Sequence, residues 1–332
     1  MIIQLKTNTD QDVINEIAVE LRAFHIKQNE TDILITSAGL KELPLSVENK
    51  VDKKWVFDSD MQLSSKSFNS SKAEIDLGTV KIGGNTNNTV LIGGPCSVES
   101  EEQIRSSAKL LKELNLSILR GGCFKPRTSP YSFQGMGKEG LILLSKMRSE
   151  FGLKIISEVR DATQVQDVIE HTDIIQIGAK AMYDQGILRA CAKTQKPVMI
   201  KRGFGTTLQE FTQAAEFILS GGNPNVILCE RGIRTFETKT RFTLDLCGVA
   251  WLQEYSNLPI ILDPSHAMGY AYGVPSLTKA CLAMGIDGLI IETHPNPPQA
   301  KSDASQQLNY TDFKKLYHDL LPIAECLGLK IL

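Results

Sequence analysis

The sequence lacks the features that mark membrane, secreted and nucleic-acid-binding proteins. No apolar run approaches the roughly 20 residues that span a membrane, and the N-terminal stretch MIIQLKTNTDQ has no basic segment followed by an apolar core and a cleavage site. The net charge is only −2, so bulk electrostatics do not favour a polyanion as a partner. We therefore expect no membrane and no nucleic acid among its partners, although a local basic site can still bind a small phosphate.

Disulfide and nucleotide-binding motifs are also missing. The seven cysteines are odd in number, scattered and free of any CxxC pair, which favours free thiols in a reducing cytoplasm. Glycine-rich stretches such as GGNPN lie before an expected strand rather than after one, so they form no dinucleotide-binding fingerprint. What remains is an ordinary globular composition, with 42% apolar and 22% charged residues, long enough for one large domain and a small one.

Residues 1–62 are expected to form the small domain. Strand-like stretches at MIIQLK, HIKQNE, DILITS and KKWVFD combine with a helical stretch, TDQDVINEIAVELRAF, and a weaker one, LKELPLSV, that Pro44 interrupts. The order βαββαβ predicts a ferredoxin-like α+β fold. Residues 63–73 contain five serines and little to bury, so we expect them to be a linker.

Residues 74–332 alternate strand-like and helical stretches and are expected to form the large domain. After a possible hairpin at EIDLGTVKIGG, short β-branched runs follow, each continuous enough to be buried on both faces as in a parallel sheet. A helical stretch follows every run, and RFTLDLCGVAWLQEY, from Arg241, is the one after the sixth. The order therefore predicts an α/β fold, a (β/α)8 TIM barrel. A doubly wound open sheet is the alternative, but such a sheet seldom repeats eight equal units without a dinucleotide fingerprint. The runs are TVLIGG, LSILR, KIISEV, DIIQIG, PVMIKR, NVILCE, LPIILD and DGLIIE.

Residues that can carry chemistry follow these runs. In a TIM barrel the active site lies where the strands end and the βα loops begin. The junctions read GGPCSVES, RGGCFKPRTSP, SEVRD, IGAKA, KRGFG, CERGIRTFE, DPSHAMG and ETHPNPPQAKSD. The opposite strand ends carry bland residues, and this asymmetry predicts an enzyme.

Four potential metal ligands lie on neighbouring strand ends. Cys96 follows the first strand, His266 follows the seventh, and Glu292 and Asp303 lie at the end of the eighth and in the loop after it. These strands are neighbours in a closed barrel, so the four side chains can meet. Thiolate, imidazole and two carboxylates favour a borderline divalent ion such as Mn, Fe, Co or Zn. The alternative is a buried free cysteine and a helix-capping histidine, and the spacing alone leaves both open.

A set of cations follows the same strand ends. Most Lys and Arg side chains are simply solvated, but an unpaired charge at the end of an apolar strand is costly. Several cations at one mouth require anions, and few internal acids share the rim, so more than one substrate phosphate or carboxylate is implied. Together with a metal, this indicates carbon–carbon bond chemistry on phosphorylated sugars, with Lys201 the only Schiff-base candidate. The cations are Arg120, Lys125, Arg127, Lys180, Lys201, Arg202, Arg231 and Arg234, and the internal acids are Glu158, Glu230 and Asp263.

The motifs at these strand ends resemble those of a known enzyme family. GPCSVES, LRGGCFKPRTSPYSFQG, QIGA, KRGFG, ILCERGIRTFE, DPSH and the ETHP…KSD…QQL tail occur in this order. Together they resemble 3-deoxy-D-arabino-heptulosonate 7-phosphate (DAHP) synthases of the type I beta subfamily, which is related to 3-deoxy-D-manno-octulosonate 8-phosphate synthase. The resemblance covers about residues 74–325 and implies the same barrel fold.

The resemblance implies a transferase reaction. Phosphoenolpyruvate, erythrose 4-phosphate and water would give DAHP and phosphate, the first step of the shikimate pathway to chorismate and the aromatic amino acids. Lys125, Cys96, His266 and Asp263 would be catalytic. The implied metal ligands are Cys96, His266, Glu292 and Asp303, and the implied substrate-binding residues are Arg120, Lys125, Arg127, Thr128, Ser129, Glu158, Lys180, Lys201 and Arg231.

Two features depart from the family pattern or match it weakly. Lys180 stands where the family usually has arginine, so the planar bidentate phosphate contact is lost and phosphate affinity could be weaker. Residues 1–62 resemble the ACT-like regulatory domain of some members, which implies feedback inhibition by Tyr or Phe, and the family implies a homotetramer. His25 falls where such domains can place an inhibitor contact, although Lys27 departs from the pattern and a half-buried strand histidine is the plain alternative.

Two other functions compete with this interpretation. The related octulosonate synthase uses arabinose 5-phosphate, but it carries Ala-Asn where this chain has Pro126 and Arg127. A degenerate barrel that binds an amino acid or a partner is the non-enzymatic alternative, and the complete rim of polar residues argues against it.

Overall fold

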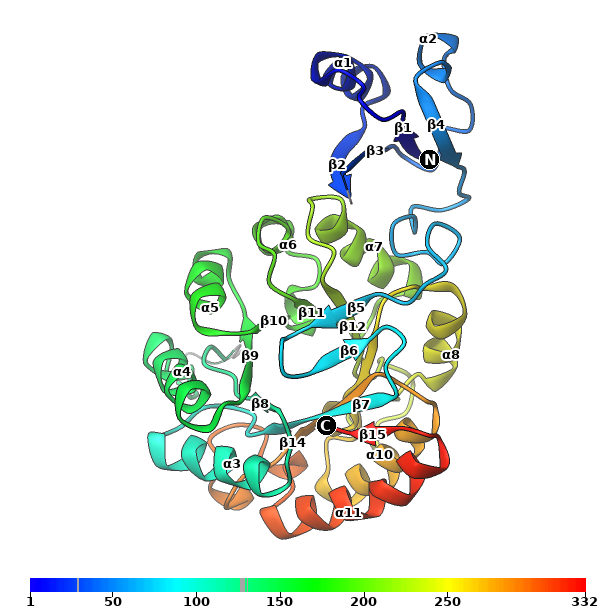
Figure 1. Ribbon diagram of the computed structural model, residues 1–332. Coiled ribbons are helices and arrows are strands. Elements are labelled where there is room, and N and C mark those ends of the chain that lie inside the picture. Colours follow the sequence, from blue (N-terminus) through cyan, green and yellow to red (C-terminus); the bar gives the residue numbers. More distant parts are fainter. Residues whose placement is uncertain (29, 126–128, 130) are drawn as a thin grey trace.

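The N-terminal domain has the predicted βαββαβ order. The computed structural model describes residues 1–332 except 29, 126–128 and 130, and it sets this domain on one side of a barrel (Figure 1). All pairings in its sheet are antiparallel in the order β2-β3-β1-β4, which is the ferredoxin-like arrangement. The second helix is a single turn that begins directly after Pro44, as expected from the weak helical pattern there. The elements are β1 (Ile2–Leu5), α1 (Gln11–Leu21), β2 (Phe24–Gln28), β3 (Thr31–Ile35), α2 (Leu45–Glu48) and β4 (Val51–Trp55).

The central strands of the small sheet, β1 and β3, carry buried side chains on both faces. Ile3 and Leu34 point to one face, where they pack with Ile14 of α1 in a core of their own. Ile2 and Ile35 point to the other face and join the large hydrophobic cluster of the barrel. The N-terminal domain is therefore docked on the barrel through its sheet.

The segment after this domain is not an exposed linker throughout. Leu63 and Ser64 are buried, and the serine composition that predicted exposure is misleading because the polar groups are bonded. Glu216 of α7 (Leu208–Leu219) accepts hydrogen bonds from the backbone N–H groups of Gln62, Leu63 and Ser64 at 2.8–3.1 Å and from the Ser64 hydroxyl at 2.6 Å. One carboxylate thus fixes the chain between the two domains.

The large domain is the predicted TIM barrel. In the described part of the chain, eight parallel strands follow one another, and β14 pairs with β7, which closes the sheet. The doubly wound alternative is wrong because an open sheet has no such pairing. The strands are β7 (Asn88–Gly94), β8 (Ile118–Arg120), β9 (Lys154–Val159), β10 (Ile174–Ile177), β11 (Val198–Lys201), β12 (Val226–Glu230), β13 (Ile260–Leu262) and β14 (Gly288–Glu292).

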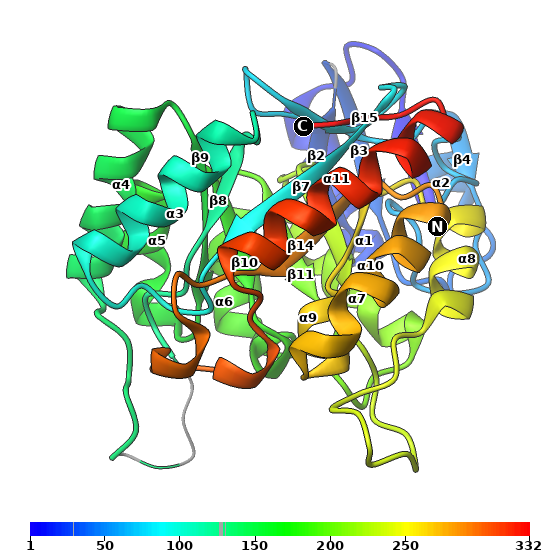
Figure 2. The same ribbon diagram turned by 90° about the horizontal axis from the view of Figure 1, so that it is seen from below.

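A ring of helices surrounds the strands (Figure 1), and Figure 2 shows α3, α10 and α11 of this ring from the side. One of them, α8, was expected from Arg241 but begins at Leu246, because the residues before it extend the preceding loop. None of the described helices is both long and apolar enough to cross a membrane. The ring consists of α3 (Glu101–Glu113), α4 (Lys138–Phe151), α5 (Val165–His171), α6 (Gln185–Ala192), α7, α8 (Leu246–Tyr255), α10 (Val274–Ala283) and α11 (Tyr310–Cys326).

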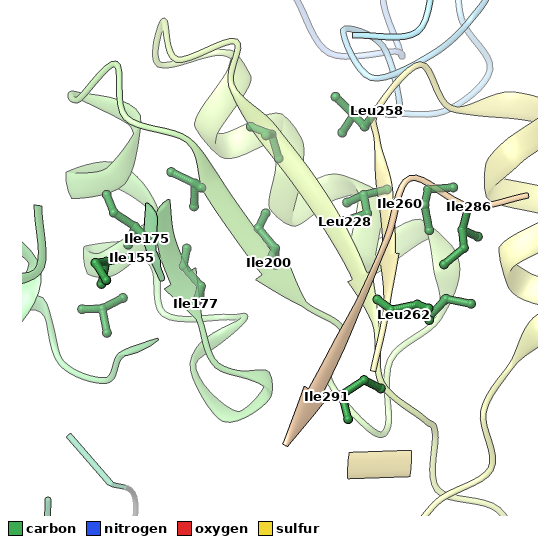
Figure 3. Packing of buried hydrophobic residues seen from close by; sticks show 14 of the residues in the cluster. Ile155, Ile175, Ile177, Ile200, Leu228, Leu258, Ile260, Leu262, Ile286 and Ile291 are labelled. Carbon is green, nitrogen blue, oxygen red and sulfur yellow. The ribbon is translucent and has the colours of Figure 1, made fainter. Parts of the chain in front are cut away.

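Strand residues alternate between two apolar layers. Ile155, Ile175 and Ile200 point outward and pack under the helices (Figure 3). Their neighbours Ile156 and Ile174 point inward, into the barrel interior. This alternation explains why the runs are mostly apolar, since both faces of each strand are buried.

The amino-terminal end of the barrel is plugged. A hairpin, β5 (Glu74–Asp76) and β6 (Lys81–Gly83), places Ile75 and Ile82 in the same cluster as the inward strand residues. The short C-terminal strand β15 (Lys330–Ile331) pairs beside β7 at that end. The carboxyl ends of the strands are left as the mouth.

Candidate active site

The four predicted metal ligands meet at the mouth. The Sγ atom of Cys96 lies 3.3 Å from Oδ2 of Asp303. Ligand atoms of Cys96, Glu292 and Asp303 all lie within 4.8 Å of one another. The Nε2 atom of His266 lies 3.5 Å from Oε1 of Glu292 and 3.9 Å from Oδ2 of Asp303. Spacing along the chain left this cluster open, and the closed barrel brings it together.

Local backbone geometry presents the ligands to one point. Cys96 follows β7 after Gly94, whose φ is +139° and where a Cβ would lie 2.2 Å from the carbonyl oxygen of Arg120. The Cys96 N–H donates to Oε1 of Gln307 at 3.0 Å. Asp303 has a left-handed φ of 48°, which turns its loop back toward the cluster. Only glycine fits at position 94, and this close approach of the backbone to Arg120 sets the direction in which the loop with Cys96 leaves β7.

His266 belongs to a short helix, α9 (Pro264–Met268), that begins at the end of β13. The cap of this helix is Asp263, whose Oδ1 accepts from the His266 N–H at 2.9 Å. The capping role that competed with metal binding for His266 therefore belongs to Asp263. The imidazole is left to face the cluster.

The protonation chemistry of the cluster fits a cation. Burial, with Glu292 adding to it, raises the pKa of the Cys96 thiol to about 12. Although burial opposes it, His266 and Arg120 lower the pKa of Glu292, so this carboxylate stays charged in a buried place. Burial also lowers the pKa of His266, which favours the neutral imidazole that ligates metals. One buried and one partly buried carboxylate, an imidazole and a thiol suit a borderline divalent ion, which would displace the thiol proton on binding.

Arg120 and Lys125 border this cluster. Arg120 donates from Nη1 to Oε1 of Glu292 at 2.6 Å and from Nη2 to the Cys96 carbonyl at 3.1 Å. Lys125 donates from Nζ to the same carbonyl at 2.8 Å. The expectation that Glu158, Glu230 and Asp263 were the internal acids of the rim was incomplete, because Glu292 also pairs with a cation. The buried Nε of Arg120 has no partner within the described residues.

Lys201 and Asp263 form a buried ion pair. Lys201 Nζ donates to Oδ2 of Asp263, and both side chains are almost fully buried. Although burial opposes it, His266 and Lys201 hold the pKa of Asp263 well below its ordinary value. An ammonium held by a carboxylate is a poor nucleophile, so this pairing does not support Lys201 as a Schiff-base residue.

Two arginines from neighbouring strand ends have different partners. Arg202 donates from Nη1 to Glu230 and to Asp245, each at 2.8 Å, and from Nη2 to the Thr206 carbonyl at 3.0 Å. Its charge is therefore neutralised inside the protein. Arg231 is 5% exposed, and its buried Nη1 makes no hydrogen bond within the described residues. Arg231 is thus the arginine of this pair that remains available for a substrate anion.

Other predicted residues lie outside this centre. Lys180 is exposed on a 3-10 turn (Ala179–Ala181). Glu158 accepts from Nε2 of Gln176 at 2.7 Å, and Ser129 is partly buried in the second loop. Arg127 and Thr128 lie outside the described residues. In the N-terminal domain, His25 pairs with Asp32 through Nε2 and Oδ1 at 2.9 Å.

The sequence analysis missed several side chains that contact the ligands. The Ser302 hydroxyl lies 3.0 Å from Sγ of Cys96. Gln306 donates to Oε2 of Glu292 at 2.6 Å and accepts from Nη1 of Arg241 at 2.7 Å. Arg241 also lies 3.5 Å from Oδ1 of Asp303. The KSD and QQL motifs were the available signal, but the tail was used to recognise a family rather than to assign these residues.

A cavity of about 550 Å³ opens beside Asp303. Arg234 and Arg241 line it, together with Tyr270 and the tip of the loop after β12. Asp303 itself lines this cavity, so the ligand cluster borders it on this side.

Comparison with known protein sequences gives related enzymes. The sequence profile described as the DAHP synthetase I family matches residues 60–324. A Thermotoga maritima protein named phospho-2-dehydro-3-deoxyheptonate aldolase is 44% identical over 270 residues, which cover 81% of this chain and 79% of the relative. A 2-dehydro-3-deoxyphosphooctonate aldolase of Bradyrhizobium diazoefficiens is 31% identical over 273 residues, covering 77% and 96% of the two chains.

Solved structures extend the likeness to the whole chain. The crystal structure of the Thermotoga maritima phospho-2-dehydro-3-deoxyheptonate aldolase (DAHP synthase) superposes with a TM-score of 0.81 at 37% identity. It covers 100% of this chain and 99% of that one. A truncated form of 3-deoxy-D-arabino-heptulosonate 7-phosphate synthase from the same organism gives a TM-score of 0.76 at 40% identity, covering 81% and 98%.

Proposed function

The chain belongs to the DAHP synthetase I family, and we propose that its barrel joins phosphoenolpyruvate to erythrose 4-phosphate with water, giving DAHP and phosphate. This is the transferase reaction that opens the shikimate pathway to chorismate and the aromatic amino acids. The observation that carries the proposal is the greater identity to a DAHP synthase, 44%, than to seven octulosonate aldolases, at 30–32%. The assembled rim supports an active enzyme rather than a degenerate barrel.

Cys96, His266, Glu292 and Asp303 would hold the divalent ion, of the Mn, Fe, Co or Zn class. When bound, the ion supplies Lewis acidity toward the aldehyde of erythrose 4-phosphate. The support is the chemistry of the donor set and the distances among these four side chains.

The cations around the cluster would bind phosphoenolpyruvate. Arg120 and Arg231 each carry a buried nitrogen without a partner within the described residues, which is the environment that favours a substrate anion. Lys125 and Lys201 add two ammonium groups near them. Fixed cations hold the carboxylate and the phosphate, so positioning and electrostatic stabilisation contribute much of the rate.

The bond changes follow from this arrangement. Carbon 3 of phosphoenolpyruvate attacks the aldehyde carbon, and water adds to carbon 2, from which phosphate leaves by C–O cleavage. We assign Lys125 as the proton donor to the aldehyde oxygen, because its Nζ lies beside the Cys96 carbonyl at the edge of the cluster. Asp263 holds Lys201 and stands next to His266, so it orients both sides of the site.

The loop after β8 would bind the sugar phosphate. Lys125, Arg127, Thr128 and Ser129 are the proposed contacts, and Glu158 and Lys180 stand at the neighbouring strand ends. A phosphate-release assay with erythrose 4-phosphate and arabinose 5-phosphate side by side tests the function. Turnover with the four-carbon sugar alone is expected. Turnover only with the five-carbon sugar would make the chain an octulosonate synthase, and no turnover with either would indicate a binding protein.

We also propose feedback inhibition by Tyr or Phe through the N-terminal domain. A cavity of about 760 Å³ lies between that domain and helices α6 and α7. Gln62 lines it and is 3% exposed, and its Oε1 has no partner within the described residues. His25, the contact expected from the sequence, is not among the residues that line this cavity and pairs with Asp32 instead. Inhibition that survives deletion of residues 1–65 would contradict this proposal.

Two further properties remain proposals. A cytoplasmic location is supported by seven cysteines that are all free thiols. A homotetramer is implied by the family resemblance, and sedimentation of the purified full chain would test it.

A further inference from the structure

Arg231 is buried, and none of the described carboxylates forms an ion pair with it. Its guanidinium carbon lies 4.2 Å from the centre of the Phe242 ring, within the range of a cation–π contact. Arg202 offers the contrast, because it donates to Glu230 and Asp245, which neutralise it. An aromatic face stabilises a buried cation without cancelling its charge. Arg231 can therefore keep a net charge for a substrate anion.

Phe242 is one layer of a longer stack. Its ring lies 5.4 Å from that of Phe204, at an interplanar angle of 28°. The guanidinium carbon of Arg234 lies 4.7 Å from the centre of the Phe204 ring, on a loop that lines the cavity beside Asp303. The stack thus runs from a buried arginine to one at the mouth.

The backbone fixes the Phe242 ring in this stack. The Phe242 N–H donates to the Ala267 carbonyl at 2.8 Å, next to His266. Ile233 and Thr243 form an antiparallel bridge that closes the loop after β12, with N–H to carbonyl distances of 2.8 and 2.9 Å. Gly232 has a φ of +97°, and a Cβ there would lie 2.7 Å from Cβ of Phe242. The ring has little freedom to leave its place.

We propose that Phe242 is a positioning residue, which holds the guanidinium of Arg231 by its face so that its edge binds the phosphate or carboxylate of phosphoenolpyruvate. The proposal rests on the proposed function for the identity of the anion. The N–H groups of a guanidinium lie in its plane, so a ring on the face leaves them free for bidentate contact. Arg241 also lies beside this ring, with its guanidinium carbon 5.9 Å from the ring centre, but Arg231 is closer and is the residue through which Phe242 is proposed to act.

Phe242→Leu tests this role, since it keeps an apolar side chain and removes the aromatic face. We expect the KM for phosphoenolpyruvate to rise about 3- to 30-fold, the range of a partly or fully desolvated cation–π contact, with kcat and the KM for erythrose 4-phosphate changed less than twofold. Phe242→Tyr keeps the face and should restore the wild-type KM. Phe236→Leu, on the same loop at a residue that is 97% exposed, is the matched control.

A coupling experiment separates positioning from general packing. In an Arg231→Gln background, adding Phe242→Leu should change the KM for phosphoenolpyruvate by less than twofold, because the group through which Phe242 acts is gone. Three results would overturn the proposal. Phe242→Leu could raise the KM for phosphoenolpyruvate and for erythrose 4-phosphate equally, it could leave the KM for phosphoenolpyruvate unchanged, or it could raise that KM as much in the Arg231→Gln background as in the wild type. If Phe242→Leu does not fold, Phe204→Leu removes only the second ring of the stack and gives a milder test. It should raise the KM for phosphoenolpyruvate by a smaller factor and leave the KM for erythrose 4-phosphate unchanged.

The two levels of the proposal can fail separately. A wild-type chain that makes no DAHP contradicts the proposed function. The dissociation constant of phosphoenolpyruvate, measured calorimetrically on the wild type, Phe242→Leu and Phe242→Tyr, still tests the stack in that case. Equal dissociation constants in all three would refute it.

Discussion

The Nδ1 atom of His266 lies 2.8 Å from Oδ2 of Asp263, the same oxygen that pairs with Lys201. One buried carboxylate thus stands between a proposed metal ligand and a proposed substrate-binding cation. A partner on the second ring nitrogen sets the orientation of a ligating histidine and the nitrogen that it presents. We therefore expect metal binding and phosphoenolpyruvate binding, if the chain has both, to be coupled through Asp263.

Asp263→Asn should weaken both functions together. We expect metal affinity to fall about 10- to 100-fold, because the amide cannot orient His266 as a carboxylate does. The KM for phosphoenolpyruvate should rise as well, since Lys201 loses its partner. Metal titration and steady-state kinetics on one preparation would show this, and a variant with reduced turnover but unchanged metal affinity would contradict the coupling.

Cys96→Ala should abolish turnover while the fold is kept. The side chain is buried and small, so its loss removes a ligand and little packing. The measurements are metal content, circular dichroism and phosphate release, with Cys247→Ala, at an exposed cysteine, as the control. A chelator should likewise inactivate the wild type, and added Mn, Fe, Co or Zn should restore it. Near wild-type turnover of Cys96→Ala with the metal chelated would refute the metal role.

Arg202→Met should destabilise the chain rather than alter substrate binding. Removal of this guanidinium leaves Glu230, which is fully buried, and Asp245 without their shared cation. Breaking a buried pair in this way typically costs about 3–5 kcal/mol. Urea unfolding would measure the loss. The matched variant Arg231→Met should instead raise the KM for phosphoenolpyruvate with a smaller loss of stability, and the reverse pattern would contradict the assignment of the two residues.

Lys180→Arg tests the departure from the family pattern. A guanidinium can bind a phosphate oxygen pair, whereas an ammonium offers a point charge, so the KM for phosphoenolpyruvate should fall severalfold. Lys180 is exposed, so the substitution should leave the unfolding temperature unchanged. An identical KM would show that the position does not contact the substrate.

Glu216→Gln should change how stability depends on pH. Burial raises the pKa of Glu216, even though four donors from residues 62–64 oppose the shift. The folded chain therefore binds this proton more tightly than the unfolded chain. The contribution of Glu216 to the free energy of unfolding is largest below the unfolded pKa, near 4.3, and declines as pH rises through the folded pKa.

Glu210 on the same helix is the matched control for this experiment. The Thr207 N–H and hydroxyl lower its pKa, so its contribution is present above the unfolded pKa and is lost as pH falls. The unfolding free energies of the wild type and the two variants should be measured between about pH 4 and 7. The difference between wild type and Glu216→Gln should fall as pH rises, and the difference between wild type and Glu210→Gln should grow. Parallel curves for all three would contradict the assigned shifts.

The barrel was predictable because its strands have no exposed face. A run such as NVILCE is apolar without interruption, and β12 occupies Val226–Glu230 within it. The predicted start of α8 at Arg241 was wrong. Residues 241–245 have the apolar spacing of a helix, but the bridge between Ile233 and Thr243 holds them in the loop. The spacing of apolar residues along a short stretch cannot predict a backbone contact, such as this bridge, with a residue ten positions away.

The site was predictable in its members and not in its pairings. The sequence indicated that Arg202 and Arg231 both follow apolar strands, and it offered no means to tell them apart. The difference depends on Asp245, which reaches Arg202 from the start of α8. Similarly, the serines after Leu63 were expected to be exposed, because nothing in their vicinity along the chain reveals Glu216.

The hairpin of β5 and β6 closes one end of the barrel, so the site at the mouth is reached only from the opposite end. Ile75 and Ile82 seal the far end, so every molecule that enters must leave past the loops through which it came. If Arg120 and Lys201 bind phosphoenolpyruvate as proposed, we expect this anion to enter before the sugar phosphate, which would then cover it and shield it from bulk water.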